Sequence, residues 1–399
     1  MLRPGTFALT ALLAGLSAFG PLTTDMYLSS MPDIARQLSA TPAQVQFTIS
    51  AYLIGLAVGQ IAYGPVSDRY GRKPVLLGAL GIYSLAGLAC ALSASIDLLV
   101  AARVFQALGA AGLLVVTRAV VRDLYTGARA GRELSVIAAV MALGPVLAPA
   151  VGGLLQTAFG WRSVFFALLF VGLAGIAAVV FLLPETLRER APERFSLMAM
   201  LRSFGVLLRH PAYVAYLGLG TFSFAGLIVW ITSASFVLQD LYGLSPFHFG
   251  VLFAFGALGY MSGSTFAARS VTGLGINRVV GLGSVTLVIG GLAMLAALAF
   301  APSSALCLVI AAAIYIAGLG MVFSQSIAGA LSPFPERAGA ASSLFGFCQQ
   351  SVAAGGGALI GVLMGQSAWP VAIMVAAFGG LTFVLWAATR AMRLKAVKS

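Results

Sequence analysis

Long apolar stretches separated by short polar segments run along almost the whole chain. About 20 apolar residues in a helix cross the hydrocarbon layer, because a helix rises about 1.5 Å per residue and the layer is about 30 Å thick. Windows of that length predict an all-α membrane protein with twelve transmembrane helices. The predicted spans are approximately 6–29, 44–64, 75–94, 98–121, 134–157, 163–183, 213–237, 248–268, 279–300, 305–328, 340–362 and 370–390.

One polar separator, residues 185–211, is much longer and more charged than the others. Because it divides the predicted spans into six and six, we expect a six-helix bundle over residues 1–184, a cytoplasmic linker over 185–211, and a second six-helix bundle over 212–399. Within the linker, the pattern from Ser196 to Leu208 indicates an amphipathic helix on the membrane surface.

Composition supports a membrane protein, since 60% of the residues are hydrophobic and only 9% are charged, against about 25% charged in soluble domains. The formal net charge of +12 fits cytoplasmic loops, which collect Lys and Arg, better than a nucleic-acid partner. If both termini are cytoplasmic, every Lys and Arg except Arg36, Arg103 and Arg162 lies in the cytoplasm or at a span end facing it. We therefore expect an N-in, C-in orientation with the lipid bilayer and a small molecule as partners.

The residue types needed for catalysis are scarce. The two histidines are predicted on opposite sides of the membrane, and the three cysteines, Cys90, Cys307 and Cys348, lie in apolar segments without metal-ligand spacing. The sequence contains no HExxH, CxxC, P-loop or Gly-x-Ser-x-Gly motif. We expect neither an enzyme, nor a metal site, nor ATP-driven transport by this chain alone.

The segment between the second and third predicted spans carries a specific motif. Gly64, Asp68, Arg69, Gly71 and Arg72 are spaced within ten residues. Glycine permits a tight turn, and the charged side chains can bind helix ends and one another. A basic inner loop would explain the charges but not the spaced glycines and the aspartate. The segment resembles the loop signature of the major facilitator superfamily.

Two other spans agree with this resemblance. The fourth carries Arg103, Gln106 and Gly109, similar to the superfamily's arginine-containing fourth-helix motif. The fifth resembles the signature associated with antiporters, with Ala148 at a position where glycine is usual. Its motif residues are Gly144, Pro145, Ala148, Pro149, Gly152 and Gly153.

Three further segments resemble the Bcr/CflA group of multidrug exporters: 24–28, 122–125 and 184–186, with Ser29 where that group usually has proline. The resemblance implies a monomeric, proton-coupled antiporter that exports small, largely apolar drug-like molecules across the bacterial inner membrane by alternating access, with protons as coupling ion and no cofactor. The alternatives are an exporter of a metabolite such as a sugar or amino acid, a uniporter or symporter, and a receptor or scaffold on the same fold.

Two ionisable residues are predicted inside spans at matching depths, Asp25 in the first and Arg103 in the fourth. Each costs about 2.5–3.5 kcal/mol on insertion scales. Burial disfavours a charged carboxylate and a neighbouring guanidinium favours it, so a change of exposure can shift the balance. We expect Asp25 to carry the proton with Arg103 as its electrostatic partner. A static packing pair, or Asp25 as a substrate ligand, are the alternatives.

The remaining candidate residues form three groups. Substrate contacts are expected from a set of polar and aromatic residues because they are spread over several spans, although any single one of them more often serves packing. They are Tyr27, Tyr52, Gln60, Gln106, Phe222, Phe224, Trp230, Phe236, Gln325, Gln349 and Gln350. A cytoplasmic latch, or else a solvated loop, is expected from Gly64, Asp68, Arg69, Gly71, Arg72 and Asp123. The fifth-span residues Gly144, Pro145, Ala148, Pro149, Gly152 and Gly153 are expected to form a bend and a seal.

Overall fold

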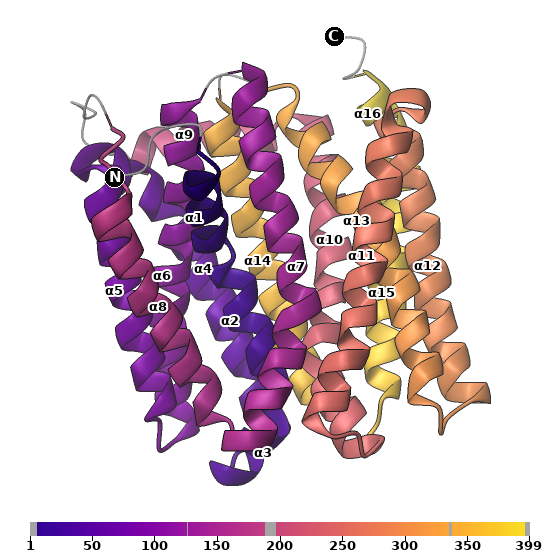
Figure 1. Cartoon of the computed structure of the whole chain (residues 1–399). Helices are drawn as coiled ribbons and strands as arrows, with labels where there is room; N and C mark the ends of the chain where they lie inside the picture. The colour runs from indigo at the N-terminus through magenta and orange to yellow at the C-terminus, as the bar shows by residue number, and fades with distance from the viewer. Residues whose placement is uncertain (1–5, 126, 188–196, 335–336, 396–399) are drawn as a thin grey trace. The chain divides into compact units, whose positions relative to one another are not determined.

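The computed structural model describes residues 6–125, 127–187, 197–334 and 337–395 (Figure 1). In these ranges the chain is helical and contains no strand. It divides into two compact units, Met1–Phe195 and Ser196–Ser399.

The described residues of the first unit form eight helices. Within it, α4 packs along α6, α5 lies between α6 and α8, and α2 lies against α7. The helices are α1 (Phe7–Ser17), α2 (Phe19–Leu28), α3 (Met31–Gln37), α4 (Pro42–Tyr70), α5 (Arg72–Ala91), α6 (Ile96–Leu124), α7 (Gly127–Phe159) and α8 (Arg162–Leu182).

In the second unit, α13 packs against both α11 and α12, and α10 contacts α13, α14 and α15. One π-helical turn extends α10. The elements are α9 (Leu197–Leu208), α10 (Pro211–Phe236), η1 (Val237–Leu241), α11 (Pro246–Leu274), α12 (Ile276–Phe300), α13 (Ala305–Leu331), α14 (Ala338–Leu363), α15 (Trp369–Ala388) and α16 (Arg390–Lys395). A helix therefore occupies the amphipathic part of the linker, and its place on a membrane surface stays a prediction.

The chain is a multi-pass membrane protein. Each predicted span overlaps a long helix or, for the first span, a pair of helices. Among the described residues, nine helices are long and apolar enough to cross a membrane, or ten if a bent pair counts as one span. In α7 only the part Gly144–Phe159 is apolar, and it is shorter than a full span. Helix α14 is not among the nine, and its sequence contains many small residues and two glutamines. The count of twelve, the two six-helix bundles and the N-in, C-in orientation stay predictions.

The first predicted span is divided in two, because α1 and α2 meet at a bend of 48°. Pro21 explains the position of the bend. Proline has no backbone N–H, so it cannot donate to the carbonyl four residues earlier, at Ser17, and its ring crowds that carbonyl. Ser17 is the last residue of α1. The bend tilts α2, which carries Asp25, away from the axis of α1.

Local sequence signals explain where several helices begin. Thr41 and Gln44 form a reciprocal capping box at α4. The hydroxyls of Ser95, Ser245 and Ser304 each accept a hydrogen bond from the backbone N–H three residues later at the starts of α6, α11 and α13. These caps satisfy N–H groups that have no partner within the helix.

Small residues let α11 approach α13 closely. A Cβ atom at Gly259 would lie 2.5 Å from the carbonyl oxygen of Ala313, and one at Gly263 would lie 1.9 Å from that of Ala317. Both distances are too short for a side chain. The face of α11 that carries Gly259 and Gly263 is thus packed tightly against α13.

A fully buried arginine fastens the C-terminal helix α16 to the rest of the second unit. Arg393 Nε donates to Asn277 Oδ1 at 2.9 Å, and its Nη2 donates to the Trp386 carbonyl at 2.6 Å. Its Nη1 donates to the Thr389 hydroxyl. Because Asn277 lies at the start of α12 and Trp386 near the end of α15, the guanidinium ties these two helix ends together and stabilises the carbonyl end of α15.

Candidate functional site

Asp25 lies in α2 and is only 5% exposed, and its carboxyl group forms no hydrogen bond or ion pair with any residue in the described ranges. Buried carboxylates are normally paired or hydrogen-bonded, since an isolated buried charge is costly. Among the described residues, the carboxyl group of Asp25 therefore has no partner in this structure that would hold it ionised.

Arg103 in α6 is fully buried in an aromatic box. Its guanidinium carbon lies 4.2 Å from the ring centre of Tyr52, 4.7 Å from that of Tyr27 and 6.0 Å from that of Phe165. Its Nη1 donates to Gln106 Oε1 at 2.9 Å. Aromatic faces attract a cation most strongly where water is excluded, so the box stabilises the charge of Arg103 without an acidic partner.

Hydroxyl contacts hold α2 against its neighbours around this box. Tyr27 Oη lies 2.7 Å from Thr48 Oγ1 of α4, and Thr23 Oγ1 lies 2.5 Å from Tyr83 Oη of α5. Arg103 Nη1 also reaches the Thr23 carbonyl at 3.5 Å. The structure thus brings together Tyr27 of α2, Tyr52 of α4, and Arg103 and Gln106 of α6.

No ion pair joins Asp25 to Arg103 in this structure, although both belong to the described residues. The polar contacts of Arg103 are instead to Gln106 and to the backbone of Thr23, two residues before Asp25. Any electrostatic coupling between Asp25 and Arg103 would therefore act across the backbone from Thr23 to Asp25, or in a conformation other than this one. The role of Arg103 as electrostatic partner stays a prediction.

Helices α2 and α7 approach each other closely beside Asp25. A Cβ atom at Gly152 would lie 2.1 Å from the carbonyl oxygen of Met26, so only glycine fits. One at Gly144 would lie 3.3 Å from Cβ of Pro21. The fifth-span motif therefore presents its smallest residues to the helix that carries the acid.

The other fifth-span residues lie within the same helix. Pro145 and Pro149 are inside α7, where each removes a backbone donor. Ala148 is fully buried, and the Gly153 carbonyl accepts a hydrogen bond from the Thr157 hydroxyl at 2.7 Å. The predicted bend and seal is a functional role that this geometry does not test.

The motif between the second and third spans is centred on Arg72, which is largely buried at the start of α5. Arg72 Nε donates to Asp123 Oδ2 at 2.8 Å and Nη2 to Asp123 Oδ1 at 3.3 Å. Its Nη1 donates to Asp68 Oδ1 at 2.5 Å and to the Ser67 hydroxyl at 2.7 Å. Of the predicted latch residues, Arg72, Asp68 and Asp123 are brought together, and Ser67 joins them.

Arg69 and Gly64 stand apart from this cluster. The exposed guanidinium of Arg69 lies 5.4 Å from the ring centre of Tyr70. Gly64 has open space where a Cβ would be placed, but its carbonyl accepts a hydrogen bond from the Ser67 hydroxyl at 2.9 Å.

Glu185 is a cluster member that the sequence reasoning did not assign. Its Oε1 accepts hydrogen bonds from the backbone N–H groups of Arg72 at 2.9 Å, of Thr186 at 2.9 Å and of Leu187 at 3.0 Å. Its Oε2 accepts from that of Lys73 at 3.1 Å. A carboxylate here is favoured by the N-terminal dipole of α5. The resemblance of residues 184–186 to the multidrug exporters drew attention to Glu185. It did not indicate that Glu185 binds the backbone of Arg72, 113 residues earlier in the chain.

Gly71 makes this capping possible. Its φ of +102° lies in a region that side chains rarely adopt. A Cβ atom at Gly71 would also lie 2.6 Å from Oε2 of Glu185. The glycine therefore serves both the turn into α5 and the approach of the carboxylate.

Unequal effects on stability are expected from the two acids around Arg72. The side chain of Asp123 is 18% exposed and binds Arg72 through both oxygens, whereas that of Asp68 is 49% exposed and binds through one. Charge-assisted hydrogen bonds with buried groups contribute about 1.5–3 kcal/mol, and exposed ones less. Asp123→Asn should lower the unfolding temperature of the purified protein more than Asp68→Asn. Equal shifts, or a larger one for Asp68→Asn, would show that Arg72 does not depend on Asp123.

Two predicted pocket residues in the first unit differ in their surroundings. Gln106 is fully buried beside Arg103, and its Nε2 has no hydrogen-bond partner in the described part of the unit. Gln60 lies eight residues after Tyr52 on α4, is half-buried, and forms no hydrogen bond to the cluster.

In the second unit, the predicted pocket residues lie on three helices. Trp230 and Phe236 of α10 are buried, whereas Phe222 and Phe224 are half-buried. Phe224 stacks on Phe323 of α13 with ring centres 5.5 Å apart.

The three predicted glutamines of the second unit lie on α13 and α14. Gln325 is 9% exposed and Gln349 is 8% exposed. Gln350 is half-buried, and its Oε1 has no hydrogen-bond partner in the described part of the unit. No cluster of three or more His, Cys, Asp or Glu that could hold a metal ion occurs among the residues that the structure describes.

Comparisons with known proteins agree with one another. The family model described as Major Facilitator Superfamily matches residues 8–357. The chain is 35% identical to an uncharacterized MFS-type transporter, YdgK of Bacillus subtilis, over 85% of each chain. It is 31% identical to a bicyclomycin resistance protein homolog of Haemophilus influenzae over 92% of each chain.

A third relative and a solved structure extend this picture. The chain is 30% identical to multidrug resistance protein D of Escherichia coli, over 88% of this chain and 87% of that protein. The crystal structure of a D-xylose-proton symporter matches with a TM-score of 0.76 and 15% identity, over 94% of this chain and 97% of that one, which shows a shared fold. Its helical fold and its relatives show that this chain is a multi-pass inner-membrane transporter belonging to the Major Facilitator Superfamily.

Proposed function

We propose that the chain is a proton-coupled antiporter that exports small, largely apolar drug-like molecules across the bacterial inner membrane by alternating access. Asp25 carries the proton and Arg103 acts as its electrostatic partner. The observation that carries the proposal is the carboxyl group of Asp25, buried in a membrane helix without a hydrogen bond or counter-ion in the described chain.

The chemistry of that site supports reversible protonation. A buried carboxylate without a partner is costly when ionised, and solvent contact removes much of the cost. A group that faces a dry site in one state and water in another can therefore bind a proton and release it. The aromatic box keeps Arg103 charged nearby without an acidic partner, so its field favours proton release when Asp25 is exposed.

The direction and substrate class rest on relatives and on helix packing. The resistance proteins named above are similar over most of their length. The close contact of Gly152 with the Met26 backbone links α7 to the helix of Asp25, so a movement of α7 would change the surroundings of the acid. Export of drug-like compounds in exchange for protons is consistent with both the similarity to resistance proteins and the contact between α7 and the helix of Asp25.

Purified protein in sealed proteoliposomes tests the proposal. With a pH gradient imposed, a chloramphenicol-like or bicyclomycin-like compound should trigger proton movement that protein-free liposomes do not show. Binding without proton movement would indicate a receptor or scaffold. Proton movement with a sugar or amino acid alone would indicate a metabolite exporter.

A further inference from the structure

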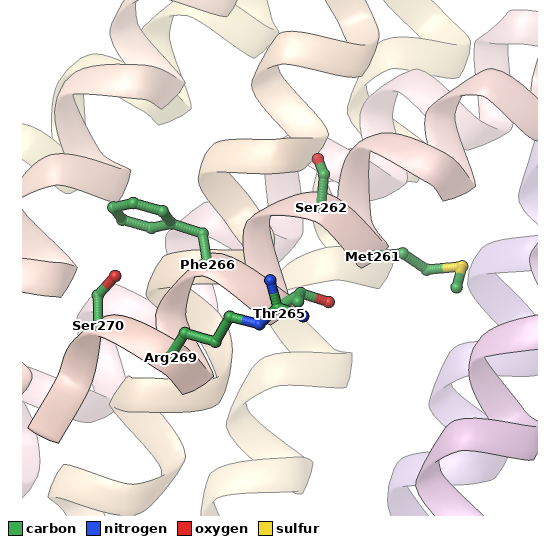
Figure 2. Close-up of a pocket in the computed structure, with 6 residues that line it drawn as sticks. All are labelled: Met261, Ser262, Thr265, Phe266, Arg269 and Ser270. Atoms are coloured by element: carbon green, nitrogen blue, oxygen red, sulfur yellow. The ribbon is translucent and has the colours of Figure 1, made fainter.

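The exposed face of α11 carries polar residues at membrane depth, in contrast to that of α12. On α12 the exposed positions include Leu282, Val285 and Ile289, as expected for a helix against lipid. On α11, by contrast, Ser262, Thr265 and Arg269 are exposed. Figure 2 shows these residues on consecutive turns of one helix.

A depression of about 510 Å³ lies along this face. Its volume falls in the range of about 300–1,000 Å³ that is common for small-molecule sites. The lining combines four polar side chains with two large apolar ones: Met261, Ser262, Thr265, Phe266, Arg269 and Ser270. Gly259 and Gly263 pack on α13, whereas the exposed residues Ser262, Thr265 and Arg269 lie on another side of α11.

The depth of these residues argues against a lipid headgroup as their partner. Arg269 lies five residues before the end of α11 at Leu274, and Ser262 lies twelve residues before it, or about 8 Å and about 18 Å along the axis. Arginine alone can extend to the membrane surface, but the hydroxyls of Ser262 and Thr265 cannot. A face that is polar over this depth fits an aqueous pathway better than lipid.

Among the described residues, the Ser262 hydroxyl donates to the Gly259 carbonyl at 2.8 Å, and the other three polar side chains on this face have no partner. Arg269, Thr265 and Ser270 form no hydrogen bond or ion pair with any described residue, and in Figure 2 the Arg269 side chain extends along the helix toward Thr265. Arginine offers five N–H donors and no acceptor. The sequence from Ser196 to Ser399 contains only two acidic residues, Asp240 and Glu336, and neither lies on α11.

From these observations, we infer that the face of α11 around Arg269 is a contact site for the exported compound, and that it recognises an anionic or acceptor-rich head on an apolar body. Arg269 and the hydroxyls of Thr265 and Ser270 bind the head, while Met261 and Phe266 contact the body. This inference rests on the proposed export function, and it extends the substrate class toward anionic amphiphiles.

Two fluorescent probes that differ by one sulfonate test the site: 8-anilinonaphthalene-1-sulfonate, which is anionic, and N-phenyl-1-naphthylamine, which is neutral. Both are titrated into the protein in zwitterionic-lipid nanodiscs, with protein-free nanodiscs subtracted. Arg269→Gln should weaken binding of the sulfonate about tenfold or more, since a charge-assisted bond contributes about 1.5–3 kcal/mol, and should leave the neutral probe within about twofold. Arg278→Gln, an exposed arginine at the start of α12 and outside the depression, should change neither affinity.

Unchanged sulfonate binding by Arg269→Gln would overturn the inference, and so would equal losses for the two probes. A second arm replaces half of the lipid with phosphatidylglycerol. If this lipid removes the Arg269-dependent binding, the site belongs to a lipid headgroup and the inference fails. The titrations use no proton gradient, so a failure of proton coupling would refute the proposed antiport and leave the α11 result standing.

Discussion

Replacing Asp25 with asparagine should reduce compound-triggered proton movement in sealed proteoliposomes to the level of protein-free liposomes. Asparagine has nearly the same shape as protonated aspartic acid but cannot release a proton. Because Asp25 is buried and unpartnered in the described chain, the variant should fold as stably as the wild type or more so. Compound binding measured without a gradient should persist.

Two comparisons make this result specific. Asp97→Asn removes an exposed carboxylate at the start of α6 and should leave proton movement unchanged. Asp25→Glu retains a titratable group and should retain measurable coupling. Full proton-driven export by Asp25→Asn would mean that another group carries the proton.

Introducing leucine at Gly152 should abolish coupled export and lower the unfolding temperature of the protein. Even the first side-chain atom would lie 2.1 Å from the Met26 carbonyl oxygen, so α2 and α7 must separate. Overpacking a tight contact costs about 1–3 kcal/mol, and a backbone neighbour cannot turn aside as a side chain can. The displacement would fall on the residue next to Asp25, so we expect either lost export or proton leak without compound.

A graded series separates this contact from general effects of glycine replacement. Gly152→Ala should show the same defect in weaker form. Gly81→Ala in α5, where nothing lies within 4 Å of the added Cβ, should retain export and stability because alanine favours helix over glycine. Normal, tightly coupled export by Gly152→Leu would refute a sealing role for this contact.

The places of the long helices followed from the apolar pattern because lipid requires continuous apolar stretches and internal hydrogen bonding. Their lengths did not, since α4 (Pro42–Tyr70) and α11 (Pro246–Leu274) extend beyond the predicted spans 44–64 and 248–268. No helix start was predicted from capping residues, although Thr41 and Gln44 form a recognisable capping pattern. The bend after Ser17 was not predicted, since apolarity continues across it. Pro21 could have indicated the bend, because proline disrupts the helix one turn before its own position.

The candidate site was predicted in its residues more than in its contacts. Asp25, Tyr27, Tyr52, Arg103 and Gln106 were chosen because polar groups in spans are rare. Their arrangement depends on packing between distant segments, which periodicity does not reveal. The sequence suggested a pair of opposite charges, whereas the structure places Arg103 against aromatic rings.

The cluster around Arg72 was likewise predicted in its residues more completely than in its contacts. The motif from Gly64 to Lys73 identified Asp68 and Arg72, and the end of the fourth span supplied Asp123. Glu185 joins them from beyond the sixth predicted span. A residue that binds only backbone N–H groups leaves no complementary side chain in the sequence, so its partner cannot be inferred from residue types.

The proton count on compound binding tests the central claim most directly. Calorimetric titration of the purified protein with a bicyclomycin-like compound, in buffers of different ionisation enthalpy, measures the protons released per compound bound. We predict release by the wild type at a pH where Asp25 is protonated, and none by Asp25→Asn. Equal release by the two proteins would contradict the account, because the proton would then come from a different group.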